Sequence, residues 1–172
     1  TSDIAAEFNY MPSDDLSFRS SVLWNTRQDE FNQANFVSSY TGFGDAIFNL
    51  GYTYRRDANR IGLGDDLEQV DLSSYLPLNR NWAVFFQVLY DIEDKDRVND
   101  MVGFEYNNCC WRTRVLYQRF LDQRPLRQID EDFLEYEEAF FIEFQFKGLG
   151  GVGTRVTNML EEFIRGYSDN EL

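Results

Sequence analysis

Residues 82–90 read WAVFFQVLY, residues 98–106 read VNDMVGFEY and residues 111–117 read WRTRVLY. Apolar and polar side chains alternate in each stretch, and in the first stretch Gln87 lies opposite a face formed by Trp82, Val84, Phe86, Val88 and Tyr90. A period of two is typical of a β-strand whose faces meet different surroundings. The links between these stretches are rich in Asp and Asn. The sequence therefore predicts consecutive antiparallel strands here.

Six further stretches show the same alternation, and they cover residues 4–10, 16–24, 33–40, 48–55, 69–76 and 139–147. Pro77 ends the stretch at 69–76, because proline cannot donate a hydrogen bond to a strand ladder. Together the nine stretches predict an all-β fold, an antiparallel up-and-down meander of about nine strands. The length of the chain is that of one domain.

Composition and charge narrow the class of protein. The 172 residues include 30 acidic and 16 basic side chains and no histidine, for a net charge of −14. This charge disfavours a nucleic-acid partner, and the lack of histidine excludes a Ser-His-Asp triad and a histidine-ligated zinc. No carboxylate pair is marked out for acid–base chemistry. The sequence thus nominates no catalytic residue, no cofactor and no metal.

No apolar run approaches the ~18 residues that a transmembrane helix needs. The mean hydropathy of −0.49 is nevertheless compatible with a transmembrane barrel, in which every second strand residue is polar. If the protein is exported, we expect its signal peptide to have been removed or to lie outside this chain.

The connections between the predicted strands alternate in length. Short turns are expected at Met11–Asp14, Thr41–Gly44, Leu78–Asn81 and Asn107–Asn108. Longer, charged links are expected at Arg56–Asp65, Asp91–Asp96 and Asp122–Phe133, and the link at Asn25–Glu30 is intermediate. Outer-membrane barrels alternate tight periplasmic turns with longer extracellular loops in this way.

Two interpretations of the strand alternation remain open. In a soluble barrel or sandwich the apolar face points inward, whereas in a membrane barrel it points to lipid and the polar face lines a wet lumen. The aromatic residues favour the membrane interpretation, because they fall near strand ends on the apolar face, as interfacial girdles do. These residues are Tyr10, Trp24, Tyr40, Tyr54, Trp82, Tyr90, Tyr106, Trp111 and Tyr117. Bacterial single-chain barrels have even strand numbers, so either nine is a miscount by one or further strands lie upstream.

Weaker signals occur outside the strands. Residues 148–153 match G-x-G-x-x-G, but no βαβ unit surrounds them, so we interpret them as a flexible exit from the last strand. Acidic clusters at 65–66, 93–96, 130–132 and 135–138 are interpreted as solvated loops rather than metal sites. The tail has apolar residues at helical spacing, which predicts a short amphipathic helix or an irregular segment packed on its own chain or on a partner. They are Val156, Met159, Leu160, Phe163 and Ile164.

Cys109 and Cys110 are adjacent, and a bond between neighbours requires a strained ring. We therefore expect either two free thiols or two bridges to partners outside this chain.

The segment from Asn107 to Tyr117, NNCCWRTRVLY, resembles the double-cysteine segment near the C-terminus of the LptD family of lipopolysaccharide-assembly proteins. Downstream, FIEF at 141–144, KGL at 147–149 and Met159-Leu160 before Tyr167 are similar to the last strand and terminal tail of that family. The resemblance covers the whole chain as the C-terminal third or so of the family's barrel. The family's periplasmic jellyroll and first barrel strands are not in this chain.

The resemblance implies a translocon, not an enzyme, that inserts lipopolysaccharide into the outer leaflet of a Gram-negative outer membrane. It implies an LptE-type lipoprotein plug, a periplasmic bridge through the N-terminal domain, and the barrel-assembly machinery as partners. Cys109 and Cys110 would each bond to a cysteine of the N-terminal periplasmic region. Residues 1–148 would be barrel strands and 149–172 a periplasmic tail.

The resemblance also implies a lateral gate at the last strand, formed by Ala139, Phe140, Phe141, Ile142, Glu143, Phe144, Gln145, Phe146 and Lys147. In the membrane interpretation the polar faces line the lumen, and the side chains expected there include Arg19, Asn49, Gln87, Arg112, Arg114 and Gln118. Two alternatives remain: a self-contained small outer-membrane barrel, such as a porin or adhesion scaffold, and a soluble ligand-binding β-barrel.

Overall fold

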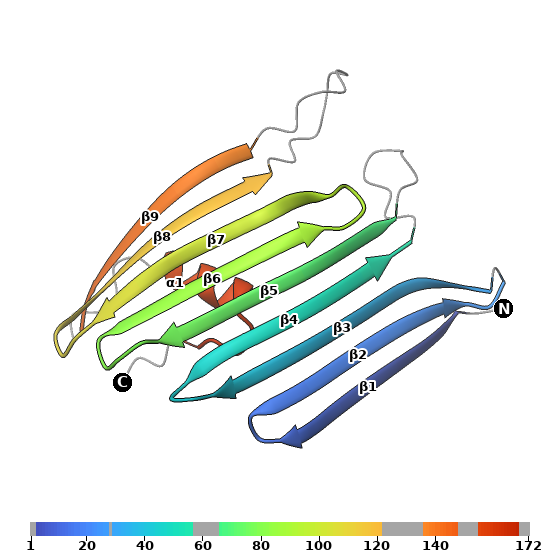
Figure 1. Ribbon diagram of the computed structural model, residues 1–172, viewed down its shortest axis with the longest axis horizontal. Coiled ribbons are helices and arrows are strands. Elements are labelled where there is room, and N and C mark those ends of the chain that lie inside the picture. Colours follow the sequence, from blue (N-terminus) through green and yellow to red (C-terminus); the bar gives the residue numbers. More distant parts are fainter. Residues whose placement is uncertain (1–2, 28, 57–65, 122–135, 148–154, 169–172) are drawn as a thin grey trace.

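The computed structural model describes residues 3–27, 29–56, 66–121, 136–147 and 155–168. In these residues it contains one sheet of nine strands and one helix (Figure 1). The strands are β1 (Ile4–Ser13), β2 (Leu16–Asn25), β3 (Glu30–Gly42), β4 (Ala46–Arg55), β5 (Leu67–Pro77), β6 (Trp82–Asp91), β7 (Asp96–Asn107), β8 (Trp111–Leu121) and β9 (Tyr136–Phe146). The helix is α1 (Arg155–Phe163).

Every strand pairs antiparallel with its neighbour in sequence, and the spatial order β1 to β9 is the order along the chain. The predicted nine-stranded meander is thereby confirmed. All nine strands occur where the alternation placed them, and most run a few residues further at one or both ends. Within the described residues, β1 and β9 are edge strands with one neighbour each.

The link between β6 and β7 is shorter than predicted. It runs only from Ile92 to Lys95, because Asp91 and Asp96 both join strands. The Asp91 carboxylate accepts the backbone N–H groups of Glu93 at 3.1 Å and Asp94 at 3.3 Å. This is an Asx turn, and Lys95 completes it with a positive φ of 56°. The link is thus no longer than the one between β5 and β6, so the predicted strict alternation of short and long connections is wrong at this point.

The helix α1 lies across one face of the sheet, which we call the inner face; the opposite face is the outer face (Figure 1). Val156, Leu160 and Ile164 of this segment are fully buried. They pack on inner-face side chains from four strands, namely Ile47, Phe85, Met101 and Leu116. This cluster is the hydrophobic core, and burial of each such side chain contributes about 1.5–3 kcal/mol.

A glycine makes room for the core beneath the helix. A Cβ atom on Gly103 would collide with the ring of Phe85 and with the carbonyl oxygen of Val115. Phe85 can therefore lie flat against β7, where its side chain is fully buried. The missing side chain explains a glycine in the interior of a strand, a position where it otherwise weakens the sheet.

Candidate functional site

The strand register places all six predicted lumen residues on the inner face. Gln87 lies opposite Ser73, which lies opposite Asn49, and Gln87 is also opposite Met101, which pairs with Gln118. The remaining members are Arg19, Arg112 and Arg114, which the same alternation puts on this side. The sequence thus placed these six polar side chains on one face of the sheet.

Most of these side chains are engaged with other protein groups. The Asn49 amide donates to Ser73 Oγ at 3.3 Å and to the carbonyl oxygen of Arg165 at 3.0 Å. Gln118 donates to Asn99 at 2.7 Å, and Asn99 in turn donates to Gln87. Asn49, Gln87, Arg112, Arg114 and Gln118 are all buried. On the inner face over β4 to β9, packed polar side chains therefore surround the hydrophobic core beneath α1.

Arg19 differs from the other five, because it lies on β2, beyond the part of the sheet that α1 covers. Its side chain is exposed, and its Nε donates to Asn9 Oδ1 at 3.0 Å. The inner face of β1 to β3 is thus a polar surface to which α1 does not extend.

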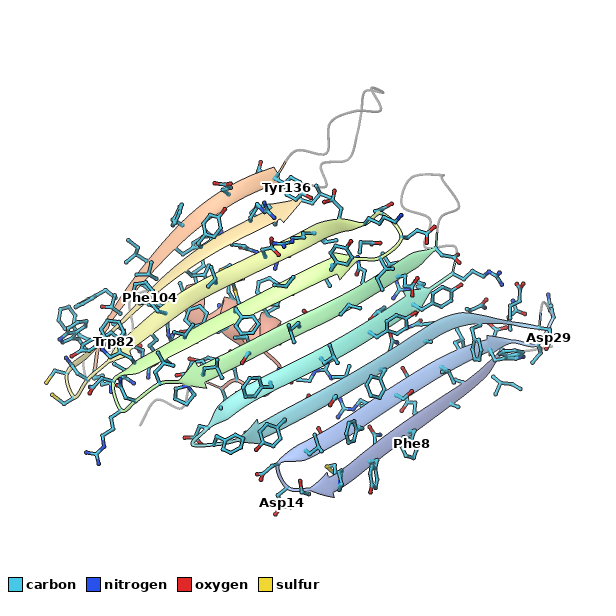
Figure 2. The ribbon with its side chains drawn as sticks, viewed as in Figure 1. Phe8, Asp14, Asp29, Trp82, Phe104 and Tyr136 are labelled. Carbon is cyan, nitrogen blue, oxygen red and sulfur yellow. The ribbon has the colours of Figure 1, made fainter. Side chains whose placement is uncertain are left out.

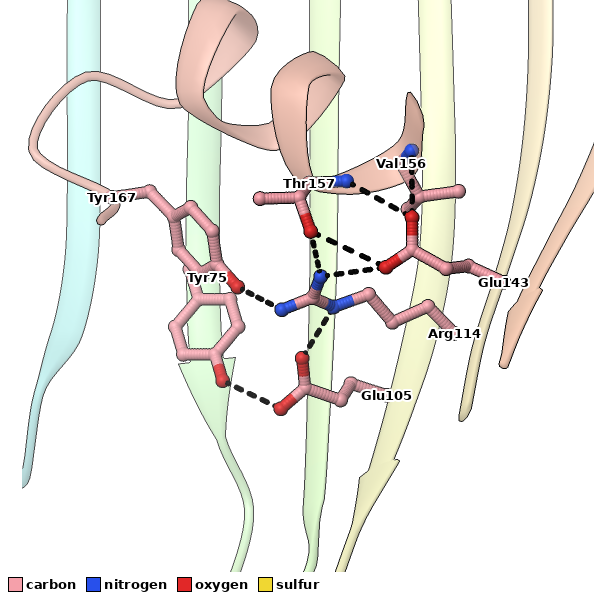
Figure 3. A network of polar contacts seen from close by, with 7 residues as sticks. All are labelled: Tyr75, Glu105, Arg114, Glu143, Val156, Thr157 and Tyr167. Carbon is pink, nitrogen blue, oxygen red and sulfur yellow. Dashed lines mark hydrogen bonds and ion pairs between the residues drawn. The ribbon is translucent and has the colours of Figure 1, made fainter. Parts of the chain in front are cut away.

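Arg114 is the centre of the buried layer, with only 1% of its surface exposed. Its Nε donates to Glu105 Oε2 at 2.7 Å, and its Nη1 donates to Glu143 Oε1 at 3.0 Å (Figure 3). Nη2 donates to the Tyr167 hydroxyl at 2.7 Å, and Nη1 also reaches the Thr157 hydroxyl. One guanidinium therefore joins β7, β8, β9 and both ends of the α1 segment.

Glu143 binds the start of α1 as well as Arg114. Its Oε2 accepts the backbone N–H of Val156 at 3.0 Å, and its Oε1 accepts the Thr157 hydroxyl at 3.2 Å. The first N–H groups of a helix have no partner within the helix, and a carboxylate there is also favoured by the helix dipole. Glu143 of β9 thus serves as the cap of α1.

Glu105 completes the cluster on the other side. Besides Arg114, it accepts the Tyr75 hydroxyl at 3.5 Å, and the Tyr75 ring lies 5.0 Å from that of Tyr167 (Figure 3). The group contains one cation and two carboxylates. A buried cluster of this kind contributes little net stability but is costly to break, because removal of one member leaves an unpaired buried charge.

The assembly of this cluster was not predicted from the sequence. Arg114 and Glu143 were expected on the polar face, but Thr157 and Tyr167 were assigned no role. Glu143 was predicted as part of the gate strand, whereas its carboxylate is buried against the chain's own tail. The signal that could have found the cluster is the register, which places Arg114 between Glu105 and Glu143.

The predicted gate strand, residues 139–147, comprises the part of β9 from Ala139 to Phe146 together with Lys147. Its outer side chains are among the most exposed apolar groups of the chain, with Phe140 at 73% and Ile142 at 76% exposed. Its inner side chains face β8 neighbours and α1. The strand pairs with β8 from Tyr136 to Phe146 without a register shift. Its other edge has no strand partner within the described residues.

Cys109 and Cys110 lie in the turn between β7 and β8, and both are free and exposed. Their Sγ atoms are 2.8 Å apart, and a hydrogen bond between the two thiols raises the pKa of Cys110 above its ordinary value. The turn is fixed by Asn108, whose side-chain oxygen accepts the N–H groups of Cys110 and Trp111, each at 2.9 Å.

The outer face carries the exposed apolar side chains of the sheet. On β6 its side chains are apolar or aromatic from Trp82 to Tyr90, a distance of about 26 Å at ~3.3 Å per residue. At the end with the cysteine turn, ring centroids 4.8–5.4 Å apart link β6 to β7, β7 to β8 and β8 to β9. A further contact joins Phe144 and Phe146 within β9. This aromatic row consists of Trp82, Tyr106, Trp111, Phe144 and Phe146. Trp82 is labelled in Figure 2.

Charged side chains occur on the outer face mainly at the opposite end of the sheet. Asp100 accepts a hydrogen bond from Arg119 at 2.8 Å, and Tyr52 donates to Glu68 at 2.7 Å. A second set of aromatic residues lies there, with Trp24 and Phe31 in edge-to-face contact at 4.5 Å. The apolar band is therefore bordered by rings at both ends.

The acidic clusters and the glycine-rich segment singled out in the sequence form no metal site in the described residues. Glu93 and Asp94 are exposed in the β6–β7 turn. The glycines at 148–153 and the acidic residues at 65, 130–132 and 135 lie outside the described residues. In the part of the chain that the structure describes, no group of three or more potential ligands could hold a metal ion. No described helix is long and apolar enough to cross a membrane.

One antiparallel meander with an apolar outer face and a polar inner face defines this chain as a segment of a β-barrel. The sequence model of the family described as "LptD: LPS transport system D" matches residues 1–82. The chain is 33% identical over 99% of its length to the LPS-assembly protein LptD of Saccharophagus degradans. It is 30% identical over 97% to the protein of that name from Xanthomonas campestris pv. campestris, and 26% identical over 97% to that from Hahella chejuensis.

The chain belongs to the LptD family. It spans about one fifth of the length of these curated relatives, namely 21%, 19% and 20%.

Proposed function

We propose that the protein containing this chain inserts lipopolysaccharide into the outer leaflet of the outer membrane, and that this chain supplies C-terminal strands of its barrel. The observation that carries the proposal is the outer face, which exposes large apolar side chains on consecutive strands between two sets of aromatic residues. A soluble protein rarely exposes so extensive an apolar surface. The family name and the names of the relatives supply the substrate. The protein acts as a translocon rather than an enzyme.

The open inner face of β1 to β3 would receive a plug. Arg19 and Asn9 are exposed there, so this surface suits a polar partner. We assign an LptE-type lipoprotein to this position and water to the rest of the lumen. The α1 segment supports a smaller plug, because it already covers the inner face over β4 to β9.

The cysteine turn would face the periplasm. Two exposed thiols at the end of the sheet with the tight turns suit two separate bridges to an N-terminal periplasmic region, in a compartment that favours disulfides. That region would also connect the barrel to the periplasmic bridge, and the barrel-assembly machinery would insert the strands. The C-terminal tail beyond α1 would end on the same side.

The gate would lie along the free edge of β9. Phe140 and Ile142 are exposed enough to meet lipid, and this edge is available to pair with the first strand of the barrel. The junction between β9 and that first strand, which we call a seam, is where the sugar headgroup of lipopolysaccharide would pass through the barrel wall. The seam between β8 and β9 would stay closed, because Arg114 and α1 bind both strands.

The test is depletion of the full-length protein in its own organism. Lipopolysaccharide at the cell surface is measured with a membrane-impermeant label, and complementation with the intact gene serves as the control. We expect surface lipopolysaccharide to fall and to accumulate inside the cell. Unchanged surface labelling after complete depletion would reject the function. The alternatives, a porin or adhesion scaffold and a soluble ligand-binding barrel, predict that outcome.

A further inference from the structure

A hollow opens on the outer face at the end of the sheet opposite the cysteine turn. It has a volume of about 520 Å³ and lies over β2, β3 and β4, next to the β2–β3 turn that carries Asp29 (Figure 2). Ala34 lies at the floor of the hollow and leaves space there, because its side chain is a single methyl group. It pairs with Val22 on one side and with Tyr54 on the other. A larger side chain at position 34 would fill the hollow.

The walls of the hollow are aromatic and held in place. Trp24 and Phe31 form one wall in edge-to-face contact. Tyr52 and Tyr54 form the other, and their hydroxyls donate to Glu68 at 2.7 Å and to Asp66 at 2.8 Å. Hydroxyls anchored in this way fix the planes of the two rings. The hollow is therefore preformed, which lowers the entropic cost of binding a flat apolar surface.

The charged residues at the edge of the hollow are two carboxylates, Asp29 and Glu30, and one guanidinium, Arg56, so hydrogen-bond acceptors predominate there. Arg56 forms an ion pair with Glu30, so its charge is already compensated. Asp29 lies exposed beside this pair. The local charge is negative, which disfavours a phosphate but suits hydroxyl groups that donate hydrogen bonds to carboxylates. Aromatic walls with a few polar groups at the rim are the usual composition of a small-molecule site.

We propose that this hollow binds the sugar ring of a glycolipid, with the apolar face of the ring against Tyr52 and Tyr54 and its hydroxyls toward Asp29 and Glu30. The inference rests on the proposed function, since it takes the outer face to meet lipid. Tyr and Trp side chains lie at the level of lipid headgroups in membrane proteins, which is where the sugar of a glycolipid sits. The acyl chains of the same molecule would lie along the apolar band below.

The test uses the full-length protein in phosphatidylcholine nanodiscs. Two photoactivatable lipids that carry the same diazirine next to the glycerol backbone are compared: a neutral glucosyl diacylglycerol and a zwitterionic phosphatidylcholine. Crosslinked peptides are mapped by mass spectrometry. We expect the glycolipid to label residues 24–34 and 52–56 about tenfold more than the phospholipid does. Equal labelling of these peptides by both lipids would overturn the sugar preference.

Ala34→Phe should abolish the preference, because the added ring occupies the hollow. Ser38→Phe is the matched control: it adds the same ring on the same strand and face, between Phe18 and Leu50, and should leave the preference intact. A preference that survives Ala34→Phe would overturn the assignment to this hollow.

Peptides from the outer face of β9, residues 140–146, separate this inference from the proposed function. If both lipids label them equally while the hollow shows no preference, only the inference fails. If neither lipid labels them, the membrane orientation and the proposed function fail with it.

Discussion

Arg114 holds one positive charge between the carboxylates of Glu105 and Glu143, in a place with almost no access to solvent. Such a buried ion cluster adds little net stability when it is intact, but removal of its cation is strongly destabilising. A variant without the guanidinium leaves two carboxylates buried beside each other, at a cost of about 3–5 kcal/mol. This cost is comparable to the packing of two or three α1 side chains.

Arg114→Leu should therefore release α1 from the sheet. Limited proteolysis of the full-length protein in detergent, with peptide mapping, should show faster cleavage within residues 155–168. Arg19→Leu makes the same change at an exposed inner-face position and should leave the cleavage rate unchanged. Equal protection of the tail in both variants would show that the cluster does not hold the helix.

The thiol pair gives a second prediction at this scale. The hydrogen bond with Cys109 raises the pKa of Cys110, so less thiolate is present at a given pH than in an isolated thiol. In Cys109→Ala, the pH midpoint for iodoacetamide alkylation of Cys110 should shift downward, and alkylation near pH 7 should be faster. The measurement is alkylation followed by mass spectrometry in a chain with reduced thiols. An unchanged midpoint would contradict the hydrogen bond.

At the scale of the element, β9 has two unequal edges. Its pairing with β8 is reinforced by Arg114 and by the capping of α1, whereas its other edge has neither. The strand that the resemblance identifies as a gate is thus firmly bound on one side. Opening would leave β9 attached to β8 and separate it from its other neighbour.

Two engineered disulfides distinguish these seams. Thr113 and Phe144 are opposite each other in the register of β8 and β9. Cysteines at these two positions should crosslink without loss of lipopolysaccharide export, because this seam does not part. A crosslink between β9 and the first strand of the full-length barrel should block export until it is reduced. Loss of export from the β8–β9 crosslink alone would move the gate to the other edge.

The strands and the helix could be predicted because the spacing of apolar residues that indicates them lies within each segment. An alternation such as that of residues 82–90 specifies a strand and its two faces without knowledge of any partner. The apolar spacing from Val156 to Ile164 likewise predicted a helix or packed tail, and the structure shows the helix on its own sheet. Turn lengths were less predictable, since Asp91 and Lys95 shorten their link through side-chain and backbone geometry that alternation does not contain.

The cluster around Arg114 was not predictable in the same way. Its members come from four strands, β5, β7, β8 and β9, and from the tail, and Tyr167 is 53 positions from Arg114. Only the register of β7, β8 and β9 and the return of the tail bring them together. The alternation assigned Glu143 to the correct face, but nothing in the local sequence indicates that a helix terminus covers it.

The whole molecule is a sheet with two chemically different faces. We predict that spin labels at Phe36, Val102 and Ile142 on the outer face report lipid in the reconstituted full-length protein. A label at Arg19 on the open inner face should report water or a plug. Gln87 and Gln118 are buried, so labels there would disturb the polar layer rather than report on the lumen. Water at the outer positions and lipid at Arg19 would reverse the orientation.

The bond between Glu143 and the N-terminus of α1 has a consequence for the order of assembly. Because successive strand residues point to opposite faces, a shift of β9 by one residue would turn Glu143 away from Arg114 and leave the helix uncapped. The helix, which is synthesised after β7, β8 and β9, can pack in this position only when these three strands have reached their correct alignment. Packing of α1 thus depends on the alignment of the strands made before it. In a misaligned sheet the helix would remain unpacked, and proteases could remove it.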